Sequence, residues 1–506
     1  MENRSQWGTR LGFLLAAMGS AIGLGNIWRF PATAYENGGG AFFLPYLFAL
    51  LTAGIPILIM EYTIGHKLRG SAPKSFNKMN KGFEWIGWWQ VAISFVISTY
   101  YAVIIAWALM FAWYAIGLDW GSDTQGFFLS DFLNMADPGV FGDMVPKILI
   151  PLLLVWVIVL GVLSRGVKKG IEIANKVFIP TLVVLFLIIV IRAITLEGAV
   201  NGLDTFFKPD WSRIADGSVW IAAYGQIFFS LSIAFAIMIT YSSYLPKKSD
   251  ITNNAFITGF ANSSFELLAG IGVFAALGFM ASQVSTPVTE IVDGGIILAF
   301  VVFPEIINQM PLAPFFGFLF FASLVLAGLS SLISISETYV ASVSEKFNIS
   351  RTAAVVFGGG LAALISLAYA TQGGLVLLDT VDHFIMSYGV ALAGLFEVVA
   401  IAWFFKGLKD LQNHANEVSD IKLGLWWRVC LGVITPAVLG YMMIQNLSTE
   451  LTNSYEGYPL DFLFTYGWLV AIGAMVVGAL FTVKEWPLEA TGSSNDQSKE
   501  DQEVAQ

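Results

Sequence analysis

The chain has 506 residues and a formal net charge of −10, with 56% hydrophobic and only 12% charged residues. An ordinary soluble domain has about 25% charged residues, so this composition argues against a soluble globular protein, and the acidic balance gives no reason to expect nucleic acid as a partner. The single cysteine excludes a disulfide within the chain. The three histidines are too far apart in the sequence to indicate a metal cluster.

Apolar runs near 20 residues recur along almost the whole chain, and each is long enough to cross a hydrocarbon core of about 30 Å. Twelve membrane spans are expected, near residues 11–35, 41–65, 88–117, 146–164, 171–194, 218–244, 254–281, 315–343, 353–370, 375–405, 424–447 and 461–483. The segments between them are too short to fold as separate domains. The last residues, from Glu489 onwards, are rich in polar and acidic side chains and are expected to be disordered.

The charges of the loops predict the orientation. The loop after the second span carries Lys67, Arg69, Lys74, Lys78 and Lys81. The loop after the third span carries aspartates, among them Asp119, Asp123, Asp131 and Asp137, and no lysine or arginine before Lys147. Positive residues favour the cytoplasmic side of a membrane, so both termini are expected to be cytoplasmic.

The first span is interrupted by residues that lipid does not favour. Between Gly19 and Pro31 it holds three glycines, Asn26 and Arg29. Backbone that leaves the helix within hydrocarbon must be buried in protein or line a cavity. The sixth span also has polar and small residues at its centre, around Ser230 and Ser232. Two interrupted helices at matching places in two five-span halves indicate a transporter built from inverted repeats.

Several motifs now resemble one family. Trp7–Gly12 and Gly23–Pro31 are similar to the signature of the neurotransmitter:sodium symporter family, and Glu36–Phe42, Gly225–Phe229 and Ala327–Ser331 match it as well. The resemblance covers roughly residues 4–480 and is closest to the bacterial amino-acid branch, which includes the bacterial leucine transporter. It implies an all-α integral membrane protein with 12 transmembrane helices, a 5+5 inverted repeat and discontinuous helices 1 and 6.

That resemblance also implies the organisation of the chain and its location. Residues 1–9 would form a cytoplasmic N-terminal segment, 10–405 the transporter core with spans 1–5 and 6–10 as repeats, 406–486 spans 11 and 12, and 487–506 a disordered acidic cytoplasmic tail. The protein would lie in the cytoplasmic membrane of a bacterium.

The implied function is sodium-coupled import of a neutral, hydrophobic amino acid by alternating access, without chloride. The partners would be the amino acid, sodium ions and the lipid bilayer, with two sodium sites, no organic cofactor and a homodimer left open. An enzyme is not indicated, because no nucleophile with a base or metal cluster is present. A binding-only sensor and a channel remain as alternatives.

Sodium is a hard cation that favours oxygen ligands, as calcium and magnesium do. By resemblance, the first ion would be bound by the Ala21 carbonyl, Asn26, Ser230, Asn262 and the carboxylate of the substrate. The second ion would be bound by the carbonyls of Gly19, Ile22 and Ala327 and the hydroxyls of Ser330 and Ser331. Alternatively, the two hydroxyls bond back to their own helix.

Glu266 lies one helical turn after Asn262, on the same face of the seventh span. An ionisable group within the membrane indicates a functional site. Animal relatives bind chloride at this position, whereas bacterial relatives have a carboxylate, and Tyr46, Gln226 and Ser230 match the other positions around the anion. The resemblance therefore implies transport without chloride. Glu266 is also a candidate for taking up a proton on the return step, or for staying neutral throughout.

The substrate site should lie between the two interrupted helices. The start of the outer half of span one, near Gly23, Leu24 and Gly25, offers free N–H groups to a carboxylate, and Tyr101 matches a family tyrosine that also contacts it. The ammonium would meet carbonyls near Ala21, Phe229 and Ser230. The side chain of the substrate would lie against a mostly apolar wall formed by Ile97, Phe229, Ser232, Phe235, Ser331 and Ile335.

Gly23 stands where amine-carrying relatives have an aspartate, which favours a substrate with its own carboxylate. Three positions differ from the bacterial leucine transporter: Ser20 replaces an asparagine, and Ala234 and Ala236 replace glycines. These differences leave the size of the substrate open.

Gates complete the implied site. Arg29 and Asp382 would form the outer pair above an aromatic lid of Tyr101 and Phe235. Arg4 and Glu345 would form the inner pair, with Trp7 and Tyr244 beside them, or remain two solvated charges. Gly170 and Pro180 would let the fifth span unwind between them.

Overall fold

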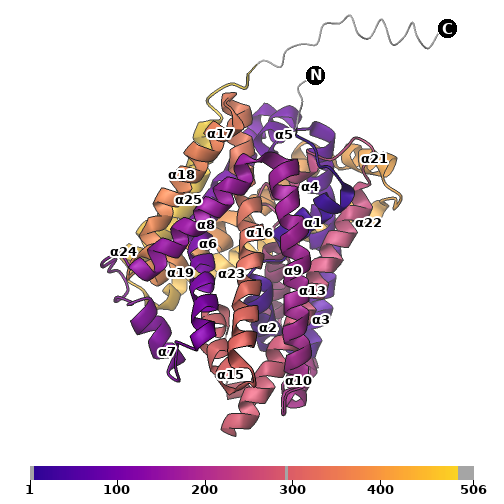
Figure 1. Cartoon of the computed structure of the whole chain (residues 1–506). Helices are drawn as coiled ribbons and strands as arrows, with labels where there is room; N and C mark the ends of the chain where they lie inside the picture. Colours follow the sequence, from indigo (N-terminus) through magenta and orange to yellow (C-terminus); the bar gives the residue numbers. More distant parts are fainter. Residues whose placement is uncertain (1–4, 291–293, 488–506) are drawn as a thin grey trace, which may run out of the picture.

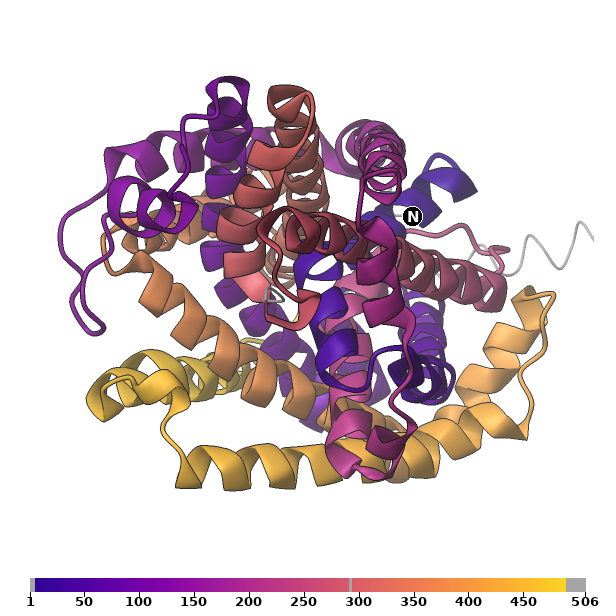
Figure 2. The same ribbon diagram turned by 90° about the horizontal axis from the view of Figure 1, so that it is seen from below.

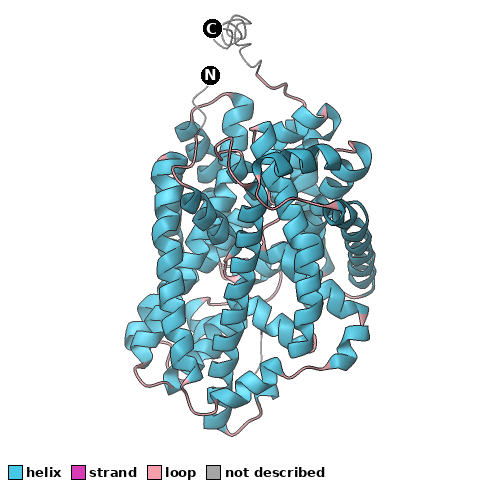
Figure 3. Cartoon of the chain, turned by 90° about the vertical axis from the view of Figure 1, so that its right-hand side faces the viewer, coloured by secondary structure: helices cyan, strands magenta, loops and turns pink. Residues whose placement is uncertain are grey.

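The computed structural model describes residues 5–290 and 294–487 as a bundle of helices (Figure 1). Within those ranges no β-strand is present, and the only sheet-like pairings are two isolated bridges, Gly39 with Pro209 and Met144 with Thr371. The colouring by secondary structure shows the same all-helical architecture from the side (Figure 3).

Ten helical segments in the described ranges are long and apolar enough to cross a membrane. They are Gly40–Leu68, Lys81–Gly117, Pro146–Ser164, Val167–Ile194, Ile251–Val284, Ala313–Phe347, Arg351–Ala370, Gly374–Phe404, Leu425–Gly457 and Leu460–Phe481. An eleventh span is the pair α1 (Arg10–Ala21) and α2 (Gly25–Glu36), which is bent by 54° at its break. At the position of the remaining predicted span lie α11 (Gly217–Ser230) and α12 (Ile237–Ser242).

The other helices either make up these spans or connect them. Within the spans lie α3 (Phe43–Ala49), α4 (Ile55–Leu68), α6 (Glu84–Gly117), α8 (Pro146–Ser164), α9 (Glu172–Ile194), α13 (Ile251–Val284), α16 (Ala313–Phe347), α17 (Arg351–Ala354), α18 (Gly360–Ser366), α19 (Gly374–Phe384), α20 (Ala391–Val399), α22 (Leu425–Val429), α23 (Thr435–Thr452), α24 (Leu460–Phe462) and α25 (Leu469–Phe481). Between the spans lie α5 (Ala72–Met79), α7 (Thr124–Gly126), α10 (Ala199–Phe207), α14 (Gly295–Ile297), α15 (Phe303–Gln309) and α21 (Leu408–Val418).

Local sequence signals fix where several helices begin. The Thr9 hydroxyl accepts a hydrogen bond from the Gly12 amide at 3.0 Å and caps α1, and the Asp250 carboxylate caps α13 through the Asn253 amide at 2.9 Å. Pro146 opens α8 at the first helical position, where its missing N–H is not needed. Several helices extend beyond the apolar runs that predicted them. The third span begins at Lys81 rather than 88, with a short 3-10 turn, Lys81–Phe83, leading into α6.

The two broken helices lie at the centre of the bundle. The long helices α6 and α16 pack along each other, α1 packs against α9, α13 and α16, and α2 packs against α11 and α13. Seen from below, α23 lies along the edge of the molecule (Figure 2). This arrangement surrounds both breaks with protein. All of the predicted tail, 487–506, except its first residue lies outside the described residues, and the division of the chain into segments stays a prediction.

Candidate substrate and ion site

The break of the first span exposes backbone groups to the centre of the bundle. Helix α1 ends at Ala21 and α2 begins at Gly25, with Ile22 at φ −77° and ψ 89° between them. The Gly23 amide donates to Oδ1 of Asn26 at 2.9 Å, and the Leu24 amide donates to the hydroxyl of Tyr101 at 3.2 Å. Side chains therefore satisfy amides that an unbroken helix would have bonded internally.

Three residues in the break of the sixth span have left-handed backbone. Ser232, Ala234 and Ala236 have φ values of 51°, 65° and 60°. This conformation costs a residue with a Cβ roughly 1–2 kcal/mol, so neighbouring groups must hold it. The Ala234 amide donates to Oε1 of Glu61 at 2.7 Å. The Ser94 hydroxyl donates to the Phe235 carbonyl, also at 2.7 Å.

The two breaks touch each other directly. The hydroxyl of Ser232 donates to the carbonyl of Ser20 at 2.9 Å, which joins the break of span six to the end of α1. The predicted counterparts therefore meet at the centre of the bundle.

Three residues predicted for the first sodium ion form one buried polar cluster. Nδ2 of Asn26 donates to Oδ1 of Asn262 at 2.8 Å and to the Ser230 hydroxyl at 3.3 Å. Nδ2 of Asn262 also reaches the Ser230 hydroxyl, at 2.5 Å. All three side chains are buried. Their amide and hydroxyl oxygens suit a hard cation.

Glu266 lies fully buried beside this cluster, on α13. One carboxylate oxygen accepts from Nε2 of Gln226 at 2.6 Å, and the other accepts from the Tyr46 hydroxyl. Tyr46 also contacts the Ser263 hydroxyl at 2.8 Å. The predicted neighbours Tyr46 and Gln226 are therefore its partners. Each of the two carboxylate oxygens of Glu266 therefore has one hydrogen-bond donor.

The residues predicted for the second sodium ion link α16 to α1. The Ser331 hydroxyl lies 3.1 Å from the carbonyl oxygen of Gly19, whereas the Ser330 hydroxyl donates to the Ala327 carbonyl of its own helix at 2.8 Å. Only Ser330 thus follows the alternative in which a hydroxyl bonds back to its own helix. The donor set consists of carbonyl and hydroxyl oxygens, which fits sodium, and the described residues contain no group of three or more His, Cys, Asp or Glu side chains placed to hold a metal.

A cavity of about 710 Å³ opens between the two breaks. Eleven of the twelve predicted substrate residues line it: Ala21, Gly23, Leu24, Gly25, Ile97, Tyr101, Phe229, Ser232, Phe235, Ser331 and Ile335. Ser230 lies in the Asn26 cluster instead. The end of the cavity next to the breaks is formed by these residues with Ser20, Asn26 and Ile104, none of which is charged.

Gly23 leaves room at this end that any side chain would fill. A Cβ atom at this position would lie 3.0 Å from the Tyr101 hydroxyl oxygen and 3.1 Å from the Ser331 hydroxyl oxygen. A side chain at residue 23 would therefore enter the space between these two hydroxyls.

The cavity continues outwards to a second group of polar residues. It reaches Asp379, Asp382 and His383 on α19 and Tyr455, Glu456 and Tyr458 beyond α23. The carboxylate of Asp379 accepts from the hydroxyls of Tyr455 at 3.1 Å and Tyr458 at 3.2 Å. The cavity is therefore open towards the loop between spans 11 and 12.

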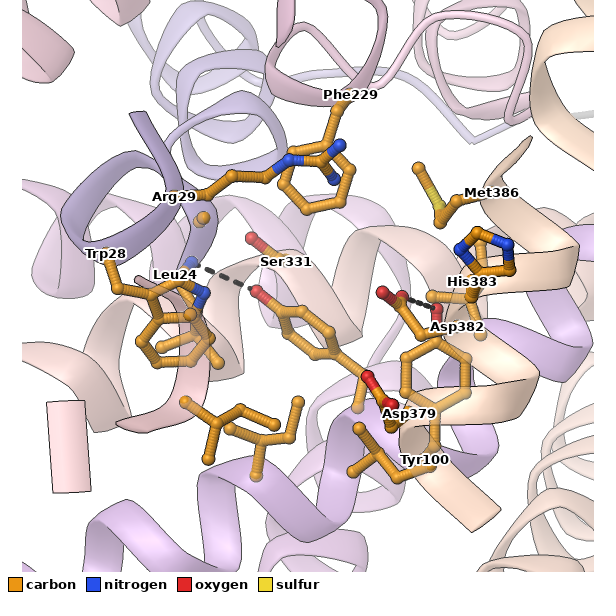
Figure 4. A pocket seen from close by; sticks show the side chains of 18 of the residues that line it. Leu24, Trp28, Arg29, Tyr100, Phe229, Ser331, Asp379, Asp382, His383 and Met386 are labelled. Carbon is orange, nitrogen blue, oxygen red and sulfur yellow. Dashed lines mark hydrogen bonds between the residues drawn. The ribbon is translucent and has the colours of Figure 1, made fainter. Parts of the chain in front are cut away.

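The predicted outer gate is not paired in this conformation. The Arg29 guanidinium lies over the Phe229 ring, 4.6 Å from its centroid, while Asp382 accepts from the Tyr100 hydroxyl at 2.6 Å (Figure 4). Motif matching gives which residues face each other but not which conformation the chain adopts, so this separation could not be predicted.

The opposite end of the bundle is closed. The Trp7 indole donates to the Tyr241 carbonyl at 2.8 Å, and the Tyr244 hydroxyl donates to Glu337 at 2.9 Å. Glu337 also forms an ion pair with Arg351 at 2.5 Å. The predicted partners Trp7 and Tyr244 are thus part of this closure.

Only one residue of the predicted inner pair, Glu345, lies within the described residues. Arg4 lies outside the described residues, and Glu345 accepts from the Ser71 amide and hydroxyl, at 3.1 and 3.0 Å. The fifth span, predicted to unwind between Gly170 and Pro180, is helical from Val167 to Ile194 in this conformation.

Three buried carboxyls were missed in the sequence. Glu61, Glu337 and Glu397 all lie in membrane spans and are fully buried. The criterion that singled out Glu266, an ionisable group within an apolar span, would have found each of them.

The cavity lies between two broken helices and is lined by main-chain groups of the breaks and by uncharged oxygen atoms. This arrangement is typical of a secondary transporter. The sequence model of the sodium:neurotransmitter symporter family matches residues 4–125 and 118–487. The chain belongs to this family, and is therefore a multi-pass membrane protein that couples sodium to the transport of a small molecule.

Individual relatives agree with this assignment. An uncharacterised sodium-dependent transporter of Methanocaldococcus jannaschii is 43% identical over 490 residues, which cover 96% of this chain and 99% of the relative. The sodium- and chloride-dependent glycine transporter 2 of Xenopus laevis is 28% identical over 95% of this chain and 69% of its own length.

The fold is similar to the crystal structure of MhsT in complex with L-phenylalanine. The two share 35% identity with a TM-score of 0.75, over 87% of this chain and 99% of MhsT. The predicted fold class, an all-α membrane protein with twelve spans in inverted repeats and discontinuous helices 1 and 6, is confirmed.

Proposed function

We propose that this chain is a symporter that imports a neutral, hydrophobic amino acid together with sodium, without chloride. The observation that carries the proposal is the division of the cavity beside the two breaks. Its polar part is backbone and uncharged hydroxyls, and its other wall is apolar. Such a site suits a zwitterion with an apolar side chain. That MhsT was crystallised with L-phenylalanine supports the same class of substrate.

The amide of Leu24 and the hydroxyl of Tyr101 would bind the α-carboxylate. They lie at the start of α2, a helix of 12 residues whose N-terminal end carries a partial positive charge. Carbonyls near Ala21, Phe229 and Ser230 would accept from the ammonium group. The substrate's side chain would lie against Ile97, Phe235 and Ile335, with Ser232 and Ser331 at its edge.

Two sodium ions would bind beside the substrate. Asn26, Ser230, Asn262 and the Ala21 carbonyl would hold the first ion, which would also contact the substrate's carboxylate. Gly19, Ile22, Ala327, Ser330 and Ser331 would hold the second and so tie α1 to α16. Each sodium entering across 100 mV would contribute about 2.3 kcal/mol.

Glu266 would supply the negative charge that chloride provides in relatives that require it. Its two donors, Tyr46 and Gln226, would otherwise be free to bind an anion. Transport should therefore proceed in chloride-free solution.

The open cavity and the closed opposite end fit a conformation that faces outwards. Closure would bring Arg29 to Asp382, and the inner end would open by separating Trp7 and Tyr244, with Arg4 and Glu345 as the inner pair. The termini would be cytoplasmic and the membrane the cytoplasmic membrane of a bacterium. A homodimer would be compatible with this cycle, because each chain contains a whole site.

Purified protein in liposomes tests the proposal. Uptake of each radiolabelled amino acid is measured with an inward sodium gradient and with potassium in its place. We expect accumulation of one or more neutral apolar amino acids only with sodium, and no need for chloride. Equal uptake in potassium would contradict sodium coupling. Accumulation of amines without a carboxylate would contradict the substrate class.

A further inference from the structure

Two buried carboxyls outside the ion and substrate sites flank the break of the sixth span. Glu61 lies on α4 and Glu397 on α20, and both side chains are fully buried. One oxygen of Glu61 accepts from the Ala234 amide at 2.7 Å, and one oxygen of Glu397 accepts from Nε2 of Gln90, also at 2.7 Å. The second oxygen of each carboxyl has no hydrogen-bond partner in the part of the chain that the structure describes.

Both carboxyls belong to one neighbourhood. Gly394, one turn before Glu397 on α20, is so close to Ala234 that a Cβ atom on it would lie 3.3 Å from the Ala234 Cβ. The Ala234 amide is the donor to Glu61. Glu61 and the turn of α20 that precedes Glu397 therefore both lie against Ala234.

Among residues 5–290 and 294–487, neither carboxyl has a cation as its partner. The partners that face them are the Ala234 amide and the Gln90 amide, both uncharged. The neighbouring titratable group is Tyr62, whose hydroxyl is already in contact with Thr258 at 3.2 Å. Two ionised carboxylates here would be like charges in a dry interior, each with an oxygen that no donor reaches, which is strongly unfavourable.

One proton removes the difficulty. A protonated carboxyl donates its O–H, and an ionised carboxylate accepts it, so a single proton between the two unpartnered oxygens satisfies both and leaves one negative charge rather than two. Glu266 differs in this respect, because each of its oxygens already accepts from a donor, Gln226 or Tyr46.

We propose that Glu61 and Glu397 share one proton and so form a proton-binding site beside the break of span six. The Ala234 amide connects the pair to the break of span six, since it stabilises the ionised form of Glu61. Movement of α12 that withdraws this amide makes Glu61 a stronger base. Protonation of the pair is therefore linked to the conformation of the break.

Infrared spectroscopy of the purified protein tests the assignment. A protonated carboxyl has a C=O stretching band separate from that of a carboxylate, and difference spectra between pH 7 and a more alkaline pH detect its loss. The variants are Glu61→Gln, Glu397→Gln and Glu266→Gln, each close in shape to the native side chain. The glutamine amide in the first two can donate to the remaining carboxylate, which then needs no proton.

The band is expected in the unmodified protein and in Glu266→Gln, and it should be lost in Glu61→Gln and in Glu397→Gln. Persistence of the whole band in both pair variants, or its loss in Glu266→Gln alone, would overturn the proposal. If one pair variant does not fold, the other still decides. The spectra are recorded without transport, so the outcome is independent of whether the chain imports an amino acid.

Discussion

The Ser331 hydroxyl lies 3.1 Å from the Gly19 carbonyl, although 312 residues separate the two along the chain. This contact joins α16 to the last turn of α1, directly before the break. A cation bound between these oxygens would fasten two helices that must part for the inner end to open.

Replacing Ser331 by alanine should weaken sodium dependence. We expect the sodium concentration for half-maximal uptake to rise about tenfold or more, which corresponds to about 1.4 kcal/mol. The same change at Ser330 should have a smaller effect, because its hydroxyl is bonded within its own helix. Ser323→Ala is the matched control, since Ser323 also donates to its own helix in α16, at 2.6 Å to Phe320. Equal shifts in all three variants would speak against a second ion at Ser331.

Adding a carboxylate at residue 23 should exclude amino acids. In Gly23→Asp the new side chain enters the space between Tyr101 and Ser331 and repels the α-carboxylate of the substrate. Amino-acid uptake is expected to fall at least about a hundredfold, with a smaller loss for binding of the corresponding amine. Gly161→Ala serves as the control, because a Cβ on Gly161 meets nothing within 4 Å. Undiminished amino-acid uptake in Gly23→Asp would rule out the proposed orientation of the substrate.

Removing the carboxylate of Glu266 should create a requirement for chloride. Glu266→Ser leaves the Tyr46 and Gln226 donors without an acceptor, and a chloride ion can take its place. Uptake is measured with chloride or gluconate as the anion. We expect uptake of the variant to be several-fold higher in chloride, and the unmodified protein and Ser263→Ala to show no such difference. The role assigned to Glu266 would be wrong if Glu266→Ser were active and indifferent to the anion.

Glycine at residues 234 and 236 should stabilise the protein. Alanine at φ 65° and 60° lowers the stability of the folded protein by roughly 1–2 kcal/mol per residue. Glycine removes this strain, but it also lowers stability by about 0.4–1 kcal/mol because it increases the entropy of the unfolded chain. The net gain is expected to be up to about 1 kcal/mol for Ala234→Gly or Ala236→Gly, visible as a higher midpoint of thermal unfolding in detergent. Ala223→Gly, at a fully buried position inside helix α11, should instead lose about 1 kcal/mol. A lower midpoint for all three would show that the positive φ values carry no strain.

Much of the fold could be predicted because a membrane limits the choices. Apolar length fixes the spans, and glycines with Asn26 locate the break of span one. The break of span six was harder, since Ala234 and Ala236 favour a helix by intrinsic preference. Contacts from other helices, the Glu61 carboxylate and the Ser94 hydroxyl, hold the chain open there.

The sequence predicted the residues of the site better than the conformation in which they lie. The ligand sets came from motif matches, and the structure brings Asn26, Ser230 and Asn262 together. The distance between Arg29 and Asp382 depends on the stage of the cycle, which no motif encodes. Glu61 and Glu397 could have been found as ionisable groups within apolar spans, whereas their closeness to each other could not, because it depends on how α4 and α20 pack around the break of span six.

The hydrogen bond from the Leu24 amide has an evolutionary consequence. Every residue except proline supplies a main-chain N–H, so most mutations at this position leave the donor intact. Substitutions at Ile97 or Ile335, in contrast, reshape the apolar wall at once. The contact proposed for the α-carboxylate, which all amino acids share, is therefore robust to mutation. The side-chain contacts that would distinguish one amino acid from another can change with single substitutions. Laboratory selection for uptake of a different amino acid should therefore begin with the residues of the apolar wall.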